Sequence, residues 1–240
     1  MSLETLERQH QVWARKPALR RIYHRYFERV LAQCTAERPT VELGSGSGFF
    51  KQHRPDIIAT DVFLSPWIDC ILDASGLPFA DGALANLVLV DVFHHFAAPQ
   101  RFLAEAARVL RSGGRIVMLE PWTGPLGFLF YRHIHQEKAD RDIDPHDPIP
   151  GDKRPFDGNP ALPELYFKSR GGKPAIDLPS GLRLVSMREI PGFDWLLTGG
   201  FQDLVPLPGP LTRLADAVES VASTARRILA LRALIVVERR

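Results

Sequence analysis

The sequence predicts an α/β domain with a doubly wound, mostly parallel seven-stranded sheet, helices on both faces and an antiparallel last strand. Between roughly residues 38 and 122, short apolar segments of strand length alternate with segments of helical periodicity. The first of these strands runs directly into a loop that contains three glycines. Strands that alternate with helices form parallel sheets through right-handed crossovers, and ligands bind beyond the carboxyl ends of the strands. We therefore expect a site at that edge, covered by a cap of loops and helices.

The spacing of apolar residues predicts each element in turn. Apolar residues at helical spacing indicate helices, and continuous apolar runs indicate strands that are covered on both faces. We expect helices over 15–34, 99–111 and 211–230. The expected strands are 40–43, 56–62, 71–72, 86–90, 115–120, 182–190 and 234–238.

Composition narrows the class of protein. The formal net charge of +2 does not favour a surface that binds a polyanion such as nucleic acid. The two cysteines, Cys34 and Cys70, lack the spacing of metal ligands, and we expect a cytoplasmic protein with reduced thiols. The N-terminal residues lack the apolar segment of a signal peptide, and no apolar run approaches the roughly 18 residues of a membrane helix.

The glycine loop is the most informative motif. Residues 44–48 read GSGSG, and the acid Glu42 lies two residues before the first glycine. Glycines at a strand-to-helix turn allow positive φ and a close approach of a ligand to the backbone. The dinucleotide fingerprint needs its third glycine where this chain has Phe49, so the spacing argues against a nicotinamide enzyme.

Two further acids lie at the predicted ends of the second and third strands. Asp61 stands where nucleoside-binding α/β folds use a carboxylate to accept hydrogen bonds from both ribose hydroxyls. Asp73 follows the third strand and can accept a hydrogen bond from an adenine amino group. The structural alternatives are a helix cap for Asp61 and a turn for Asp73.

These motifs resemble those of class I S-adenosylmethionine-dependent methyltransferases, especially the broad type 11 group. The resemblance covers roughly residues 38–122 and rests on VELGSGSG, ATDV, DASGLPF, NLVLVDVFHHF and ARVLRSGGRIVMLEP. It implies a Rossmann-like fold with S-adenosylmethionine as the methyl donor and S-adenosylhomocysteine as the product. Glu42 and the first glycines would contact the methionine part, Asp61 the ribose, and Asp73 with Ala74 the adenine. The full set that it assigns to the cofactor is Glu42, Gly44, Ser45, Gly46, Gly48, Asp61, Val62, Asp73, Ala74 and Asp91.

Three histidines are candidates for catalysis. A hydroxyl acceptor must lose a proton during methyl transfer, and His94 and His95 follow the fourth strand at the edge where the base would be needed. Packing against the cofactor or capping of a helix is the alternative for both. If residues 131–137 are helical, His133 and Glu137 share a face and could form a base with its orienting carboxylate, two metal ligands, or a solvated surface.

The region after Glu120 departs from the shared fold. We expect aromatic and histidine side chains there to bind the acceptor, and these are Trp122, Tyr131, His135 and Trp195. An acidic run suits a hard cation but lacks the glycine and closing glutamate of a calcium loop, so we expect a solvated lid and no metal. That run contains Asp140, Asp142, Asp144, His146 and Asp147.

The expected organisation is one methyltransferase domain over 1–240. It comprises a helical segment over about 1–36, a cofactor-binding half over about 38–122, and substrate-side cap insertions over about 123–180 and 191–231. We expect methyl transfer to a small-molecule or lipid-linked acceptor, with oxygen favoured over nitrogen and carbon.

Three other functions were weighed. A non-catalytic S-adenosylmethionine-binding module is the main alternative, and a nicotinamide-dependent oxidoreductase is less favoured. A nucleic-acid methyltransferase is disfavoured, because residues 91–94 replace the Asn/Asp-Pro-Pro-aromatic motif of that class and near-neutral charge offers no phosphate-binding surface. The residues leave the oligomeric state open.

Overall fold

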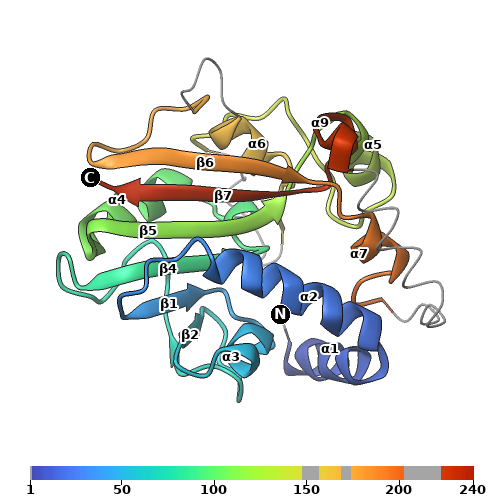
Figure 1. Ribbon diagram of the computed structural model, residues 1–240, viewed down its shortest axis with the longest axis horizontal. Helices are drawn as coiled ribbons and strands as arrows, with labels where there is room; N and C mark the ends of the chain where they lie inside the picture. The colour runs from blue at the N-terminus through green and yellow to red at the C-terminus, as the bar shows by residue number, and fades with distance from the viewer. Residues whose placement is uncertain (1, 148–156, 169–173, 203–222) are drawn as a thin grey trace.

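The computed structural model describes residues 2–147, 157–168, 174–202 and 223–240 (Figure 1). Its strands form one seven-stranded sheet in the order β3-β2-β1-β4-β5-β7-β6. Neighbours from β3 to β5 are parallel, whereas β7 is antiparallel to both β5 and β6. The fold class and the antiparallel last strand are therefore confirmed. The strands are β1 (Thr40–Leu43), β2 (Ile58–Asp61), β3 (Cys70–Ile71), β4 (Leu84–Val90), β5 (Leu110–Pro121), β6 (Leu182–Ile190) and β7 (Arg232–Arg239).

Helices lie on both faces of this sheet. The longer ones are α1 (Leu3–Arg15), α2 (Pro17–Leu31), α4 (Pro99–Val109) and α5 (Pro125–His133). Shorter helical segments are α3 (Phe49–His53), η1 (Phe93–His95), α6 (Leu162–Phe167), α7 (Phe193–Leu197), η2 (Ser223–Ala225) and α9 (Arg226–Leu229). In the described ranges, none of them combines the length and apolar character that crossing a membrane requires.

Two predicted helices differ from those observed. The helix expected over 15–34 is observed as α2, which begins only at Pro17 because Lys16 has non-helical torsion angles, and Arg15 instead ends α1, a helix that was not predicted. The helix expected over 211–230 falls largely on residues 203–222, which lie outside the described residues. The described end of that range forms η2 and α9.

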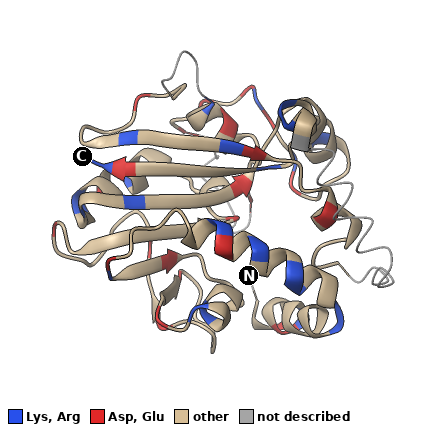
Figure 2. Cartoon of the chain, in the orientation of Figure 1, with Lys and Arg blue, Asp and Glu red and all other residues tan. Residues whose placement is uncertain are grey.

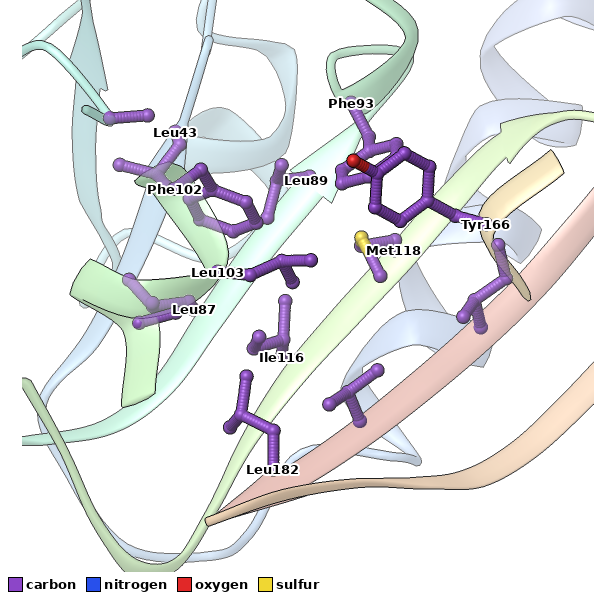
Figure 3. Packing of buried hydrophobic residues seen from close by; sticks show 14 of the residues in the cluster. Leu43, Leu87, Leu89, Phe93, Phe102, Leu103, Ile116, Met118, Tyr166 and Leu182 are labelled. Carbon is purple, nitrogen blue, oxygen red and sulfur yellow. The ribbon is translucent and has the colours of Figure 1, made fainter. Parts of the chain in front are cut away.

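Alternating side chains of the central strands supply two cores. On one face, Leu87 and Leu89 of β4 pack with Phe102 and Leu103 of α4 (Figure 3). On the other face, Val88 packs in the cluster that contains the apolar side of α2 and the start of α3. Because both faces are covered, the carboxyl ends of the strands remain as the edge at which a ligand can bind.

The last two strands enclose a long connection. β6 and β7 pair from Leu182 with Arg239 to Ile190 with Arg232. Residues 191–231 therefore leave the sheet and rejoin it at one pair of neighbouring residues.

On the surface, Lys and Arg bands are visible on α2, and charges of both signs are spread over the face shown in Figure 2.

Candidate functional site

A cavity of about 640 Å³ lies at the carboxyl ends of β1, β2 and β4. Residues that follow these strands form one side of it, and side chains of the N-terminal helices and the cap form the other. The residues from the strand ends are Glu42–Ser47, Asp61, Val62, Asp73–Ser75 and Val90–Val92. The covering residues include Gln9, Tyr23, Phe27, Glu137 and Phe201.

The glycine loop needs glycine for two separate reasons. Gly44 has a φ of 69°, and a Cβ atom there would lie 2.6 Å from Cγ2 of Val92. Gly48 has a φ of 67°, and a Cβ atom there would lie 2.5 Å from the carbonyl oxygen of Trp67. Left-handed torsion angles and the lack of room both exclude larger residues. The loop can therefore turn sharply from β1 into α3 and present its backbone to the cavity.

Asp61 connects the end of β2 to this loop. Its Oδ2 accepts a hydrogen bond from the amide of Gly46 at 2.9 Å, and its Oδ1 accepts one from the amide of Phe63 at 2.9 Å. The side chain is 5% exposed and lines the cavity. A carboxylate has about four accepting positions, so two remain for a ligand.

Glu42 is buried beneath the loop. Its Oε2 accepts a hydrogen bond from the hydroxyl of Ser45 at 2.8 Å, and the residue lines the cavity. Burial, reinforced by the negative charge of Asp61, raises the pKa of Glu42 to about 7 against the opposing effect of the Ser45 hydrogen bond. The carboxyl group is thus poised to change charge near neutral pH.

Asp73 and Asp91 complete the acidic part of the cavity wall. Asp73 is exposed, and its Oδ1 accepts a hydrogen bond from the amide of Ser75 at 2.8 Å. The side chain therefore stabilises a turn, which was the structural alternative for this residue, and it also lines the cavity. Asp91 has a φ of 59°, and its Oδ2 accepts a hydrogen bond at 2.9 Å from Arg232, which is 2% exposed. The first residue of β7 therefore holds the turn that follows β4.

His94 is anchored beneath the cavity. Its Nδ1 lies 2.7 Å from Oε2 of Glu120, which is completely buried. The other oxygen of Glu120 accepts hydrogen bonds from the amides of Val92 and Phe93 at 2.9 and 2.7 Å. Burial disfavours the charged imidazole, but Glu120 and Glu137 outweigh it and raise the pKa of His94 to about 10.

His95 and Glu137 face the cavity together. Nε2 of His95 lies 3.5 Å from Oε1 of Glu137, and Nε2 of His94 lies 3.4 Å from Oε2 of the same carboxylate. Burial disfavours the carboxylate, yet a hydrogen bond from His94 and the three nearby histidines lower the pKa of Glu137 to about 2. Both His95 and Glu137 line the cavity, whereas His94 lies behind it.

The predicted pairing of His133 with Glu137 is wrong. Helix α5 ends at His133, which is exposed, so Glu137 does not lie on the same helical face. The loop after α5 instead turns back and brings Glu137 to His94 and His95. Neither His133 nor Gly48 is among the cavity-lining residues, whereas the rest of the predicted cofactor set lines the cavity.

The four predicted acceptor-binding residues also lie away from the lining. Trp122 is buried in the core on the α4 side of the sheet. Tyr131 donates a hydrogen bond from its hydroxyl to the carbonyl of Leu231 at 3.0 Å. His135 packs 6.5 Å from Trp195, centroid to centroid, and Trp195 lies beside the guanidinium of Arg232. None of the four side chains is therefore part of the cavity wall.

Sequence reasoning missed Glu120, Arg232 and the covering residues of the N-terminal helices. A signal for Glu120 was present, because it follows a predicted strand at the same edge as Asp61. Gln9 and Tyr23 gave no such signal, since the approach of their helices to the glycine loop depends on tertiary packing. In that packing, the side chain of Ser47 donates to Gln9 at 2.6 Å.

Residues 41–118 match a family model described as a methyltransferase domain. This segment of the chain is therefore similar to methyltransferase domains. The chain is similar to demethylmenaquinone methyltransferase of Thermus thermophilus, with 41% identity over 61 residues, which cover 24% of this chain and 28% of that protein. A 37.1 kDa protein of uncharacterised function from a Streptomyces fradiae transposon is 49% identical over 49 residues, 20% of this chain and 14% of that one. The similarity therefore spans less than a third of either relative.

Solved structures extend the similarity to the whole fold. A chain in the complex between the Haloferax volcanii Trm112 methyltransferase activator and its methyltransferase partner has a TM-score of 0.53, with 17% identity over 98% of this chain and 93% of that one. Geranyl diphosphate methyltransferase, solved in complex with S-adenosylmethionine, has a TM-score of 0.50, with 15% identity over 92% and 86%. At such identities the likeness shows the fold.

Proposed function

We propose that the chain transfers a methyl group from S-adenosylmethionine to an oxygen of a small-molecule or lipid-linked acceptor. The observation that carries this proposal is the convergence of Glu42, the glycine loop, Asp61 and Asp73 on one cavity. These features come from three different strand ends, and each is of the type that the corresponding part of the cofactor requires. The cavity volume of about 640 Å³ also falls in the range of small-molecule sites.

The acidic residues of the cavity wall fit the cofactor because they have hydrogen-bond acceptor positions left for its polar groups. Each oxygen of Asp61 accepts one backbone amide, which leaves accepting positions for the two hydroxyls of a ribose. Glu42 offers a buried carboxylate beside the glycine loop for the amino acid part, and Asp73 stands on the cavity wall for the adenine. When bound, the cofactor supplies a methyl group that is already activated by its sulfonium. The task of the protein is then to hold the acceptor in line.

An oxygen acceptor is favoured by the polar side chains at the other part of the cavity. His95 and Glu137 line it and lie 3.5 Å apart, and His94 stands directly behind them. A hydroxyl group must lose its proton as it is methylated, and we place that loss at these three residues. The aromatic side chains of Tyr23, Phe27 and Phe201 give the same cavity an apolar covering for the body of the acceptor.

The experiment has two arms that separate binding from transfer. Calorimetry with S-adenosylhomocysteine measures binding, with Asp61→Ala as the comparison. Incubation with S-adenosylmethionine labelled in the methyl group then measures transfer to small-molecule, lipid, protein and nucleic-acid fractions of a cell extract. We expect label in the small-molecule or lipid fraction. Binding without transfer to any fraction would establish a non-catalytic module, and label in nucleic acid or protein would refute the acceptor class.

A further inference from the structure

His94, His95 and Glu137 form a cluster whose donor atoms face one another. One ligand-type atom from each residue can be chosen so that all three lie within 4.8 Å. The two imidazole Nε2 atoms lie 3.4 and 3.5 Å from separate oxygens of the Glu137 carboxylate. The two rings are tilted by 39°, with their centroids 4.1 Å apart.

These distances match the edge of a coordination tetrahedron. A zinc ion binds imidazole nitrogen and carboxylate oxygen at about 2.1 Å, which puts neighbouring ligand atoms of a tetrahedron roughly 3.4 Å apart. The two nitrogen-to-oxygen distances are close to this edge length, and each involves a different oxygen of the Glu137 carboxylate. Two nitrogens and one carboxylate also make up a donor set that is used for catalytic zinc, where the remaining position is left open.

The surroundings of His94 fix the orientation that a ligand needs. Glu120 accepts a hydrogen bond from Nδ1, so Nε2, which faces Glu137, is the nitrogen that can bind a metal once it has lost its proton. A carboxylate behind a histidine ligand in this manner is the usual outer partner of a metal site. Glu120 is itself held by the amides of Val92 and Phe93, so the support is rigid.

The backbone of Gly158 fixes the two rings from the other side. A Cβ atom at this position would lie 2.7 Å from Nδ1 of His95 and 2.9 Å from Cδ2 of His94. The next residue, Asn159, donates its amide to the carbonyl of His94 at 2.8 Å. The cluster is thus built from three separate segments that pack tightly around it, as preorganised ligand sites are.

Charge balance points in the same direction. Glu120 is completely buried and Glu137 is partly buried, and His94 lies between them at 2% exposure. Two carboxylates in this setting need positive charge nearby. A divalent cation supplies two charges and displaces the proton that His94 otherwise holds, because histidine binds metals in its neutral form.

We propose that His94, His95 and Glu137 bind one divalent transition-metal ion of the zinc class, with an open coordination position towards the cavity. The opening is on that side because His95 and Glu137 line the cavity and His94 lies behind. This proposal differs from the expectation of no metal that was drawn from the sequence. In a role that rests on the proposed function, the ion would lower the pKa of the acceptor hydroxyl, and the proton would pass to water because the three residues act as ligands and not as the base.

The test measures metal binding independently of methyl transfer. Protein freed of metal by a chelator is titrated with Zn²⁺ in a calorimeter, and bound zinc is counted by elemental analysis after dialysis. The wild type should bind one equivalent. Glu137→Gln and His95→Ala should each bind Zn²⁺ at least tenfold more weakly. Glu120→Gln, which changes the outer partner alone, should weaken binding by about 10- to 100-fold.

The control is His146→Ala, which removes an exposed histidine in the acidic run and should leave zinc affinity unchanged. Circular dichroism checks that each variant is folded. The metal site would be overturned if the wild type bound less than a tenth of an equivalent of zinc. It would also be overturned if His146→Ala abolished zinc binding and Glu137→Gln did not. Calorimetry with S-adenosylhomocysteine on the same samples keeps the two proposals apart. Zinc binding without cofactor binding would refute the proposed function alone, and the reverse would refute the metal site alone.

Discussion

The amide of Gly46 donates a hydrogen bond to Oδ2 of Asp61 at 2.9 Å, and both residues line the same cavity. The carboxylate at the end of β2 therefore has two tasks. It holds the glycine loop that follows β1, and it presents its remaining accepting positions to the ligand. Asparagine at this position keeps an acceptor for only one of the two backbone amides, because Gly46 and Phe63 bind separate oxygens, and it replaces the other acceptor by a donor.

Asp61→Ala should weaken S-adenosylhomocysteine binding at least tenfold, since it removes the acceptor for the ribose and releases the loop. Asp61→Asn should retain more of the stability while still losing affinity. Isothermal calorimetry measures the binding, and thermal unfolding measures the stability. Unchanged affinity in the alanine variant would refute the ribose assignment.

The raised pKa of Glu42 predicts a pH dependence of stability. Its pKa is about 7 in the folded chain against 4.5 for an ordinary glutamate, so the folded state holds a proton that the unfolded state has lost between these values. The folded state is therefore destabilised as pH rises from about 4.5 to about 7, with no further change from this group above that range.

Glu42→Gln removes this titration, and its urea midpoint should rise relative to the wild type between pH 5 and pH 8. Comparing the two proteins at each pH cancels the contributions of other groups. A difference in midpoint that stays constant with pH would show that Glu42 titrates normally.

His95→Ala should reduce methyl transfer by on the order of 10²- to 10⁴-fold, the range for loss of a group that assists proton removal. Its affinity for S-adenosylhomocysteine should stay the same, because the residues that hold the cofactor are elsewhere in the cavity. Steady-state kinetics and calorimetry on one preparation provide both values. Full activity of His95→Ala would exclude this residue from the chemistry, and a parallel loss of cofactor affinity would instead indicate a structural role.

Gly44→Ala tests why the loop needs glycine, with Gly113→Ala as a matched control. Both glycines have left-handed torsion angles, with φ of 69° and 76°, so both substitutions should cost about 1–2 kcal/mol of strain. A Cβ at Gly113 meets no atom within 4 Å, whereas one at Gly44 lies 2.6 Å from Val92.

The Gly44 variant should therefore lose more unfolding free energy than the Gly113 variant, and it alone should lose cofactor binding. Urea unfolding and calorimetry give the two quantities. Equal effects of the two substitutions on both measurements would mean that torsion strain, and not the contact with Val92, explains the glycine.

The sheet and the cofactor half of the site were predictable because their signals are local. A buried strand such as 86–90 shows as a continuous apolar run, and an acid at its end is placed by the strand itself. Asp61 and Asp73 could be located in this way before any contact was known. Their exact partners could not, because the bond from Gly46 to Asp61 joins two separate strand ends.

The cap was harder to predict because its residues are positioned by contacts that are distant in sequence. Glu137 reaches His94 only because the chain leaves helical geometry after His133. Trp122 was expected to bind the acceptor, yet it follows β5 directly and packs into the core instead. Aromatic composition alone does not distinguish a residue of a binding pocket from one of the core that supports it.

The pairing of Ile190 with Arg232 has a consequence for how such a protein can diversify. Residues 191–231 begin and end at neighbouring positions on antiparallel strands, so a segment of different length can be inserted there without shifting the register of the sheet. The entropic cost of lengthening such a loop grows slowly. This connection can thus change in length or sequence by exchange of one contiguous piece of gene, while the paired strands on either side of it keep their register.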